Sequence, residues 1–203
     1  SNQITALTYG NGKFVYAGGF GVLGTSTDGI TWTARTSGSS TYIYALTYGN
    51  GLYAHGGDSG NLYTSTDAIT WTSRTSNTTS SIWSIGYGNG LYLYGCSNIT
   101  SNYTQMGVSS DGITWISLIP VIKNNNYINR FAYGQGLYVY VGDSSNVYTS
   151  TNPLKADYSP FYDATTNFYV PSYTVSGSPT ITTAAGYNNG VYQTYIKARP
   201  WVI

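Results

Sequence analysis

The chain has 203 residues, which is enough for one sizeable domain or for a domain with a short appendage. Only 7% of its residues are charged and its net charge is +1, so it has no basic stripe to neutralise phosphates, and we expect no nucleic-acid partner. It has no run of about 18 apolar residues, so we expect no membrane insertion, and its opening without a methionine or a leader-like segment indicates a processed or excerpted piece.

The composition favours β-structure. The chain contains 23 tyrosines and 25 glycines among many Ser, Thr and Asn residues. Aromatic and β-branched side chains fit pleated surfaces, while Gly and Asn supply tight turns. A polar composition with so little charge is typical of extracellular or virion-surface proteins, and we predict that location.

Two short motifs recur in step along the chain. Tyr-Gly-Asn-Gly begins at residues 9, 48 and 87, and a Tyr-Gly-Gln-Gly copy begins at 133, so the spacings are 39, 39 and 46. Ser-Thr-Asp-Gly-Ile-Thr-Trp occupies 26–32, and near-copies of it occupy 65–71 and 109–115. A fourth copy of this second motif ends after Asn152, where Pro153 follows. A fixed period of this length indicates a repeat architecture.

Each unit contains four short strand-like runs. In the second unit they are 43–48, 52–55, 61–65 and 69–72, and Asn50-Gly51 joins the first two as a hairpin turn because Asn-Gly tolerates positive φ. Four antiparallel strands in about 40 residues are the unit of a propeller blade. The sequence therefore predicts an all-β fold: a β-propeller of about four four-stranded blades over residues 1–152, either incomplete or closed by the C-terminal segment. The predicted units are about 4–41, 43–80, 82–126 and 128–152.

The Ser-to-Trp motif resembles the Asp-box of sialidase-like, BNR-type propellers, although it is one residue shorter than that pattern. In that family the box forms the turn between the third and fourth strands, where the strand count also places it in this chain. We interpret the motif as structural, because its aspartates can accept hydrogen bonds from turn amides and its tryptophans can bury area between blades. The residues interpreted in this way are Asp28, Trp32, Asp67, Trp71, Asp111 and Trp115.

The repeat changes its length at two places. From the turn glycine to the motif aspartate the interval is 16 residues in units one, two and four but 21 in unit three, and from that aspartate to the next turn tyrosine it is 20, 20 and then 22. Both changes fall in loops on one face of the predicted propeller, at about 96–105 and 117–127, and loops on a rigid scaffold commonly carry recognition. Amides and aromatic rings there suit sugars, which offer hydroxyls and an apolar face; the alternative is that these are tolerated surface insertions. The candidate ligand-binding residues are Asn98, Asn102, Tyr103, Gln105, Asn125 and Tyr127.

The sequence offers little for catalysis. It contains no glutamate, and a glycosidase needs two carboxyl groups flanking the scissile bond. Resemblance to sialidases implies an arginine cluster, but Arg35 and Arg74 occupy equivalent repeat positions. His55, the one histidine, aligns with a tyrosine in each other unit and is interpreted as a tyrosine substitute in a strand. We therefore predict no catalytic residue, no metal site and no cofactor.

Residues 153–203 form a different region, a proline-rich connector followed by a segment with β character. Two interpretations stay open. Residues 187–192 look like a degenerate fifth turn motif that would begin another blade. Alternatively, residues 163–171 and 195–198 resemble the closing segments of phage tail-collar and tail-fibre proteins, and this resemblance implies a virion appendage.

These features predict a non-catalytic binding module of a phage-like tail fibre or virion surface appendage, with a cell-surface glycan or receptor as its ligand. We expect other virion or appendage subunits as further partners, and an oligomer. The first alternative is a purely structural virion or extracellular assembly protein. The second alternative is a sialidase-like glycosidase.

Overall fold

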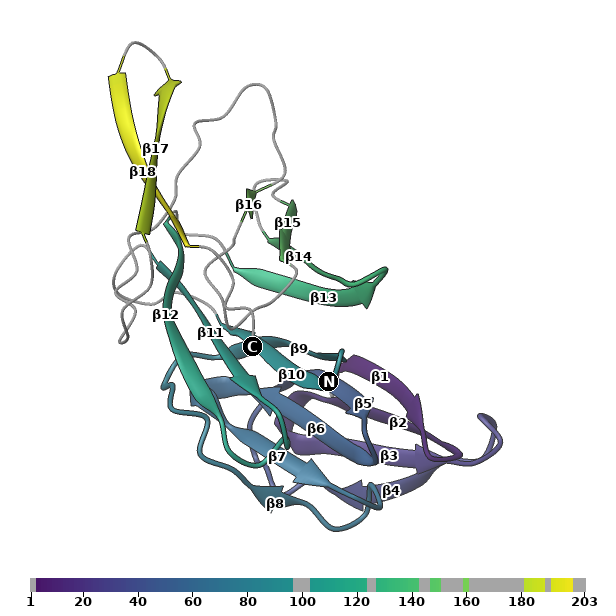
Figure 1. Ribbon diagram of the computed structural model, residues 1–203. Coiled ribbons are helices and arrows are strands. Elements are labelled where there is room, and N and C mark those ends of the chain that lie inside the picture. The colour runs from purple at the N-terminus through teal and green to yellow at the C-terminus, as the bar shows by residue number, and fades with distance from the viewer. Residues whose placement is uncertain are drawn as a thin grey trace.

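The computed structural model contains four antiparallel sheets of four strands each, followed by one sheet of two strands (Figure 1). It describes residues 3–96, 103–123, 127–142, 147–150, 159–160, 181–188 and 191–198. Within each sheet the strands lie in chain order, and each pairs with the next. The predicted all-β architecture of four four-stranded units is confirmed, and we number these sheets blades 1 to 4. The strands are β1 (Ile4–Gly10), β2 (Lys13–Gly18), β3 (Val22–Ser26) and β4 (Thr33–Thr36) in blade 1; β5 (Ile43–Gly49), β6 (Leu52–Gly57), β7 (Leu62–Ser65) and β8 (Thr72–Ser73) in blade 2; β9 (Ile82–Gly88), β10 (Leu91–Cys96), β11 (Tyr103–Ser109) and β12 (Ile116–Lys123) in blade 3; and β13 (Ile128–Gly134), β14 (Leu137–Gly142), β15 (Val147–Ser150) and β16 (Ser159–Pro160) in blade 4.

Two-residue turns join the first and second strands of every blade, as the recurring Tyr-Gly-Asn-Gly motif predicts. In blade 2, Gly49 pairs with Leu52 across a turn in which Asn50 and Gly51 have φ values of 44° and 79°. This turn needs two residues in the left-handed region, which Asn and Gly adopt more readily than other residues. The turn therefore sets the hairpin register of each blade.

The fourth strand of blade 2 begins later than the sequence predicts. The structure has β8 at Thr72–Ser73, whereas residues 69–72 were expected to form the strand. The prediction was wrong because the amides of Ile69 and Thr70 both donate to the Asp67 carboxylate at 2.8 Å, which bends this segment into the turn. Hydrogen bonding to a local side chain competes here with the sheet ladder.

Blade 4 takes its last strand from the region beyond residue 152. In β16, Ser159 pairs with Thr149 and Pro160 pairs with Tyr148. Proline is tolerated at this place because the outermost strand has one edge that needs no ladder partner. The fourth sheet thus extends past the last recognisable repeat motif.

The hydrophobic core lies between successive blades. A third-strand residue of one blade and the first-strand isoleucine of the next blade share each apolar cluster, and both are almost fully buried. The first strands also contact one another in sequence, β1 with β5, β5 with β9 and β9 with β13. The paired residues are Leu23 with Ile43, Leu62 with Ile82, and Met106 with Ile128.

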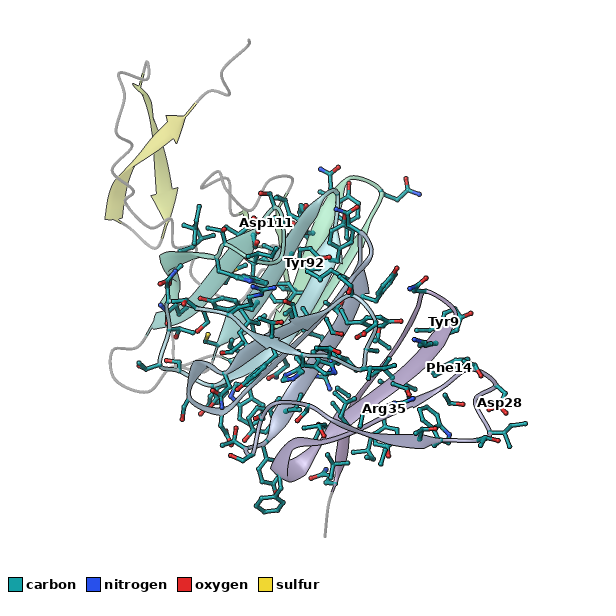
Figure 2. All side chains as sticks on the ribbon, turned by 90° about the horizontal axis from the view of Figure 1, so that it is seen from below. Tyr9, Phe14, Asp28, Arg35, Tyr92 and Asp111 are labelled. Carbon is teal, nitrogen blue, oxygen red and sulfur yellow. The ribbon has the colours of Figure 1, made fainter. Side chains whose placement is uncertain are left out.

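The two ends of this array of blades are exposed. On blade 1, Ile4, Leu7 and Tyr9 are 50%, 62% and 59% exposed, although Ile4 is the counterpart of the buried first-strand isoleucines. Figure 2 shows Tyr9 beside Phe14 on this outer blade. On blade 4, Leu137 and Val147 are 38% and 44% exposed. Within the described ranges, β1 and β13 lack the packing that joins the other first strands, so the blades form an open arc.

A separate two-stranded sheet follows the blades. It consists of β17 (Ile181–Asn188) and β18 (Val191–Ala198), with Tyr187 paired to Tyr192 and Asn188 paired to Val191. The resemblance of residues 163–171 to tail-collar proteins falls outside the described residues. No helix in the described segments has the length and apolar character needed to cross a membrane.

Candidate functional site

The motif aspartates hold the turns between the third and fourth strands. Asp67 Oδ1 accepts hydrogen bonds from the amides of Ile69 and Thr70 and from the Ser65 hydroxyl, each at 2.8 Å. Asp28 and Asp111 accept the equivalent bonds. These backbone donors favour the charged carboxylate, so they lower the pKa of Asp67 and of Asp111 to about 2, and they lower the pKa of Asp28 as well. The three carboxylates are therefore engaged in turn geometry.

The motif tryptophans differ in burial. Trp115 is 3% exposed and belongs to the cluster between blades 2 and 3, and Trp71 is half-buried against His55, with ring centroids 4.7 Å apart. Trp32 is 37% exposed, so the expectation that all three tryptophans bury area between blades is wrong for this one. Its ring packs on the Tyr16 ring of its own blade, at 5.0 Å, and no described blade precedes blade 1 to cover it further.

His55 is a buried strand residue with a structural bond. Its Nε2–H donates to the Ser37 carbonyl at 3.1 Å, and in the next blade the Tyr94 hydroxyl donates to the Ser76 carbonyl at the equivalent place. Its ring also stacks on Tyr63, its cross-strand partner. Burial lowers the pKa of His55 to about 4, so the imidazole is neutral at physiological pH. The tyrosine-substitute interpretation agrees with this geometry.

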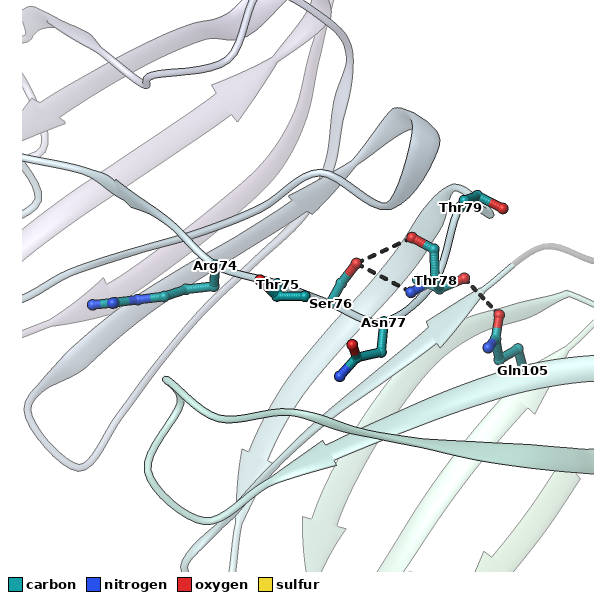
Figure 3. Close-up of a pocket in the computed structure, with 7 residues that line it drawn as sticks. All are labelled: Arg74, Thr75, Ser76, Asn77, Thr78, Thr79 and Gln105. Atoms are coloured by element: carbon teal, nitrogen blue, oxygen red, sulfur yellow. Dashed lines mark hydrogen bonds between the residues drawn. The ribbon is translucent and has the colours of Figure 1, made fainter.

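Gln105, one of the predicted ligand-binding residues, lines an open pocket of about 490 Å³ between blades 2 and 3 (Figure 3). Its amide nitrogen donates to the Ser117 hydroxyl at 2.6 Å, and its carbonyl oxygen accepts from the Thr78 hydroxyl. Ser76 and Asn77, also in the lining, donate to the carbonyls of Gly60 and Trp115. The side chains of Asn77, Thr78 and Gln105 in this pocket therefore link blades 2 and 3.

A β-bulge lies at the start of the first strand of each blade. The pairing skips one residue between Ile43 and Ala45 in blade 2, and that residue is Tyr44. The equivalent skipped residues are Thr5, Trp83 and Asn129. A bulge leaves its extra residue out of the ladder and re-aims its side chain. The four bulges lie at the same end of the blades, where the inter-blade connections arrive.

Aromatic side chains at this end form a continuous row across all four blades. Phe20, from the short 3-10 turn η1 (Gly19–Gly21), contacts Tyr42 with ring centroids 5.0 Å apart. Tyr42 stacks on Tyr44 at 5.9 Å, and Tyr44 stacks on Trp83 at 4.2 Å. Trp83 contacts Tyr127 at 6.0 Å, just before β13. We name these five residues the aromatic row.

The two ends of the aromatic row are open to solvent. Phe20 is 61% exposed and Tyr127 is 38% exposed, while the three rings between them are half-buried. Phe20 has a φ of 56°, a left-handed conformation that is uncommon for a bulky residue and costs about 1–2 kcal/mol. Its counterpart in blade 2 is Ser59, at a φ of 55°. The fold thus holds a phenyl ring outward at a strained position.

Among the described residues, one carboxylate lies beside the aromatic row. Asp58 begins the 3-10 turn η2 (Asp58–Gly60), and its Oδ1 accepts hydrogen bonds from the hydroxyls of Tyr44 at 2.8 Å and Ser81 at 3.3 Å. Its Oδ2 accepts from the amide of Tyr42 at 3.3 Å. Burial, followed by the bond to Asp58, raises the pKa of Tyr44 to about 12. Asp58 therefore fixes the central rings of the row from one side.

The structure separates the predicted ligand-binding residues. Tyr127 lies in the aromatic row and Gln105 in the inter-blade pocket, while Tyr103 begins β11 and pairs through its backbone with Lys123. Asn98, Asn102 and Asn125 lie outside the described residues.

Sequence reasoning missed four members of the aromatic row: Phe20, Tyr42, Tyr44 and Trp83. The sequence at the bulge position could have indicated two of them, Tyr44 and Trp83. The residue before it is isoleucine in every unit, while the bulge residue itself changes from Thr5 to Tyr44, Trp83 and Asn129. A variable position inside a constant scaffold is where a repeat protein can place recognition.

Ligands for a metal ion do not gather in the described part of the chain. No group of three or more His, Cys, Asp or Glu side chains converges there. Cys96 is fully buried, and this burial raises the pKa of its thiol to about 12, so the thiolate is not accessible as a ligand or nucleophile.

Comparison with known proteins identifies the fold. No protein-family model matches the chain, and no curated protein matches it. The solved structures that resemble it include the following three. The computationally designed Ika8 protein has a TM-score of 0.59 at 12% identity, covering 96% of this chain and 58% of that one. The WD40 β-propeller domain of Doa1 has a TM-score of 0.57 at 9% identity, covering 74% and 51%. YCF48 bound to D1 peptide has a TM-score of 0.57 at 16% identity, covering 78% and 55%.

The blades of this chain therefore have the β-propeller fold. The chain spans about half the length of the Doa1 structure that it matches. At these identities the likeness extends to the fold and to nothing finer.

Proposed function

We propose that this chain is a non-catalytic recognition module that binds a neutral glycan along the aromatic row. The observation that carries the proposal is the continuity of the row: five rings from four blades, each 4.2–6.0 Å from the next, with Phe20 and Tyr127 open to solvent at its ends. Exposed aromatic groups that gather on one face of a scaffold are typical of binding surfaces.

Sugar rings match the chemistry of this surface. Their apolar faces can stack on aromatic rings, and their hydroxyls need hydrogen-bonding groups nearby. Such groups flank the row: Asn61 donates to the Thr41 hydroxyl at 2.9 Å, and Ser39 shares a hydrogen bond with the same hydroxyl at 3.2 Å. A hydroxyl that is already one member of a polar pair retains capacity for a further bond to a ligand.

The charge beside the row favours a neutral glycan over an acidic one. Asp58 is the carboxylate that touches the row, and it would repel a carboxylate-bearing sugar. The two arginines of the repeat bond elsewhere, Arg35 to the Thr25 hydroxyl and Arg74 to the Thr64 hydroxyl. The described residues thus provide no arginine cluster for a sialoside.

A glycosidase activity has little support in the same geometry. Hydrolysis needs two carboxyl groups on either side of the scissile bond. Beside Asp58 the described chain offers only the motif aspartates, and these are engaged in turns at the opposite end of the blades. Asp58 itself accepts three hydrogen bonds that fix its orientation.

We place the module in a phage-like tail fibre or another virion surface appendage. The low charge, the Asp-box resemblance and the resemblance of residues 163–171 to tail-collar segments support this placement. A purely structural role is the alternative, in which the rings contact other subunits. YCF48 is described as bound to a peptide, so peptide binding is a further outcome that the test must distinguish.

The test is a glycan array probed with the labelled chain, followed by saturation-transfer NMR on the bound sugars. We expect binding to neutral glycans, with magnetisation transferred to ring protons on one face of the sugar. No binding to any glycan, or binding confined to peptides or to another subunit, would contradict the proposal. Release of reducing sugar from a bound glycan would contradict its non-catalytic part.

A further inference from the structure

Each blade docks on the blade before it through a pair of tyrosines and a glycine. The first-strand tyrosine of each blade lies over the glycine that ends the first strand of the preceding blade. Tyr48 lies so close to Gly10 that a Cβ on Gly10 would be 2.1 Å from the Tyr48 ring. The cross-strand partner of that tyrosine, Tyr53, donates its hydroxyl to the Gly10 carbonyl. The same arrangement joins Tyr87 and Tyr92 to Gly49, and Tyr133 and Tyr138 to Gly88.

At the end of the array this docking position is open. No described residue lies within 4 Å of the place that a Gly134 Cβ would occupy, whereas a Cβ at Gly10, Gly49 or Gly88 would collide with a tyrosine ring. Leu137, the cross-strand partner of Gly134, is 38% exposed. Val147, near the other end of blade 4, is 44% exposed, although its counterparts in the earlier blades are buried. Gly134 thus leaves open the docking position that Gly10, Gly49 and Gly88 provide to the next blade.

Blade 1 of a second copy of the chain lacks a hydroxyl that would be needed to dock at Gly134 in the same way. Its first-strand tyrosine is Tyr9, but the cross-strand partner of Tyr9 is Phe14, which has no hydroxyl. Every blade that docks on a predecessor has a tyrosine at this position instead. Phe14, which lacks the hydroxyl, lies in the one described blade that has no preceding blade whose glycine carbonyl could accept the hydrogen bond.

The β17–β18 hairpin carries the tyrosine pair that blade 1 lacks. Tyr187 pairs with Tyr192, five residues later, at the same spacing as Tyr48 and Tyr53. The segment between Pro160 and Ile181 can span up to about 65 Å when extended, which is ample to return from the outer edge of a blade to its inner strand. In the structure the hairpin forms its own sheet, away from Gly134.

We propose that β17 and β18 dock on the exposed face of blade 4 as the first two strands of a fifth blade. In the docked state the Tyr187 ring covers Gly134, and the Tyr192 hydroxyl donates to the Gly134 carbonyl. Thr182 and Ala185 stand where docked blades have larger residues such as Ile43 and Leu46, so the contact concentrates near the turn. This inference is independent of glycan binding, because Gly134 lies at the turn end of the blades and the aromatic row at the other.

The test measures amide hydrogen exchange in residues 181–198 of the full chain. Gly134→Ala places a Cβ where the Tyr187 ring would lie, and we expect it to accelerate exchange in the hairpin at least tenfold. Gly88→Ala, at the equivalent contact with Tyr133, gives the benchmark for such a collision in blade 4. Tyr192→Phe removes the hydroxyl, and we expect about fivefold faster exchange from the loss of one hydrogen bond.

Tyr195→Phe is the matched control, because it removes a hydroxyl from the same strand at a position that no docked blade uses. The proposal stands if Gly134→Ala and Tyr192→Phe accelerate exchange in the hairpin while Tyr195→Phe leaves it unchanged. It is overturned if neither variant alters hairpin exchange while Gly88→Ala does loosen blade 4. It is also overturned if the effects appear only at high protein concentration, since a second copy would then occupy the face.

Discussion

The indole ring of Trp83 stacks on the phenol ring of Tyr44 with centroids 4.2 Å apart and planes inclined by 12°, although the two residues belong to different blades. Each is the bulge residue of its own first strand. In blades 1 and 4 the same position holds Thr5 and Asn129, which have no ring. The stack therefore comes from two substitutions at one repeat position, and the surrounding scaffold is unchanged.

Removing the strained ring at the end of the aromatic row should separate stability from binding. Phe20→Gly relieves the left-handed conformation at a φ of 56°, so we expect the free energy of unfolding to stay the same or to rise by up to about 1 kcal/mol. Glycan binding should weaken, because the row loses an exposed ring. Urea unfolding and titration calorimetry on the same preparations check both effects.

Ser59→Gly is the control for this variant. Ser59 has nearly the same φ, 55°, in the equivalent turn of blade 2, but it contributes no ring to the row. It should match Phe20→Gly in stability and match the wild type in binding. A loss of stability in Phe20→Gly would show that the ring is there to support the fold.

Each hydrogen bond from a tyrosine hydroxyl to a glycine carbonyl of the preceding blade should contribute separately to stability. Tyr53→Phe leaves the Gly10 carbonyl without its hydroxyl donor, and we expect the free energy of unfolding to fall by about 1 kcal/mol. Burial raises the pKa of Tyr53 to about 12, so this hydroxyl remains a donor across the physiological range. The reverse change, Phe14→Tyr, should give no gain on blade 1; an equal gain there would mean that the hydroxyl acts without a partner carbonyl.

His55 should make the fold sensitive to mild acid. Its pKa is about 4 in the folded chain and near 6.5 in the unfolded chain, so between these values the unfolded state binds more protons and stability falls as the pH falls. The loss across this window should be on the order of 3 kcal/mol. Urea unfolding at pH values from 7 to 4 measures it.

A paired replacement tests the same residue without emptying its site. At this strand position Tyr140 of blade 4 pairs with Tyr148, whereas Tyr16 and Tyr94 of blades 1 and 3 pair with a glycine, Gly24 or Gly107. The variant His55→Tyr with Tyr63→Gly recreates that combination and should remove the loss of stability between pH 6.5 and 4. An unchanged pH profile in the paired variant would contradict this account.

The motif aspartates should dominate the pH dependence of stability below about pH 4. Backbone bonds lower the pKa of Asp67 and Asp111 to about 2, so their contribution is complete above about pH 4 and is lost as the pH falls toward 2. Asp67→Asn keeps an oxygen acceptor but cannot titrate. It should therefore lower stability at pH 6 and reduce the further loss between pH 4 and 2. A steep loss that Asp67→Asn leaves intact would place the titrating group elsewhere.

The repeat motifs were sufficient to predict the blades, because a two-residue Asn-Gly turn specifies both the hairpin and its register. They were not sufficient for the ends of the array. In the sequence Trp32 and Ile4 occupy the same repeat positions as more buried residues of later blades. They are exposed because no described blade covers them. The late start of β8 likewise depends on the hydrogen bonds of Asp67, which a strand pattern does not reveal.

The candidate site was predicted in part. Changes in loop length led to Tyr127 and to the end of the blades that carries the aromatic row, because the connections of that end approach the bulges. The same argument led to Gln105, which the structure engages between Thr78 and Ser117. Tyr44 and Trp83 could not be recognised as neighbours, since their stacking depends on a bulge that aims residues of two blades toward each other.

Binding of a neutral glycan to three single variants tests the central claim most directly. Phe20→Ser and Tyr127→Ser remove the exposed ends of the aromatic row, while Ile30→Ser removes a side chain that is 84% exposed in a turn at the opposite end of blade 1. By titration calorimetry with a glycan that binds the wild type, we predict that each row variant weakens binding at least tenfold and that Ile30→Ser binds as the wild type does. Equal affinity in all four proteins would contradict the account.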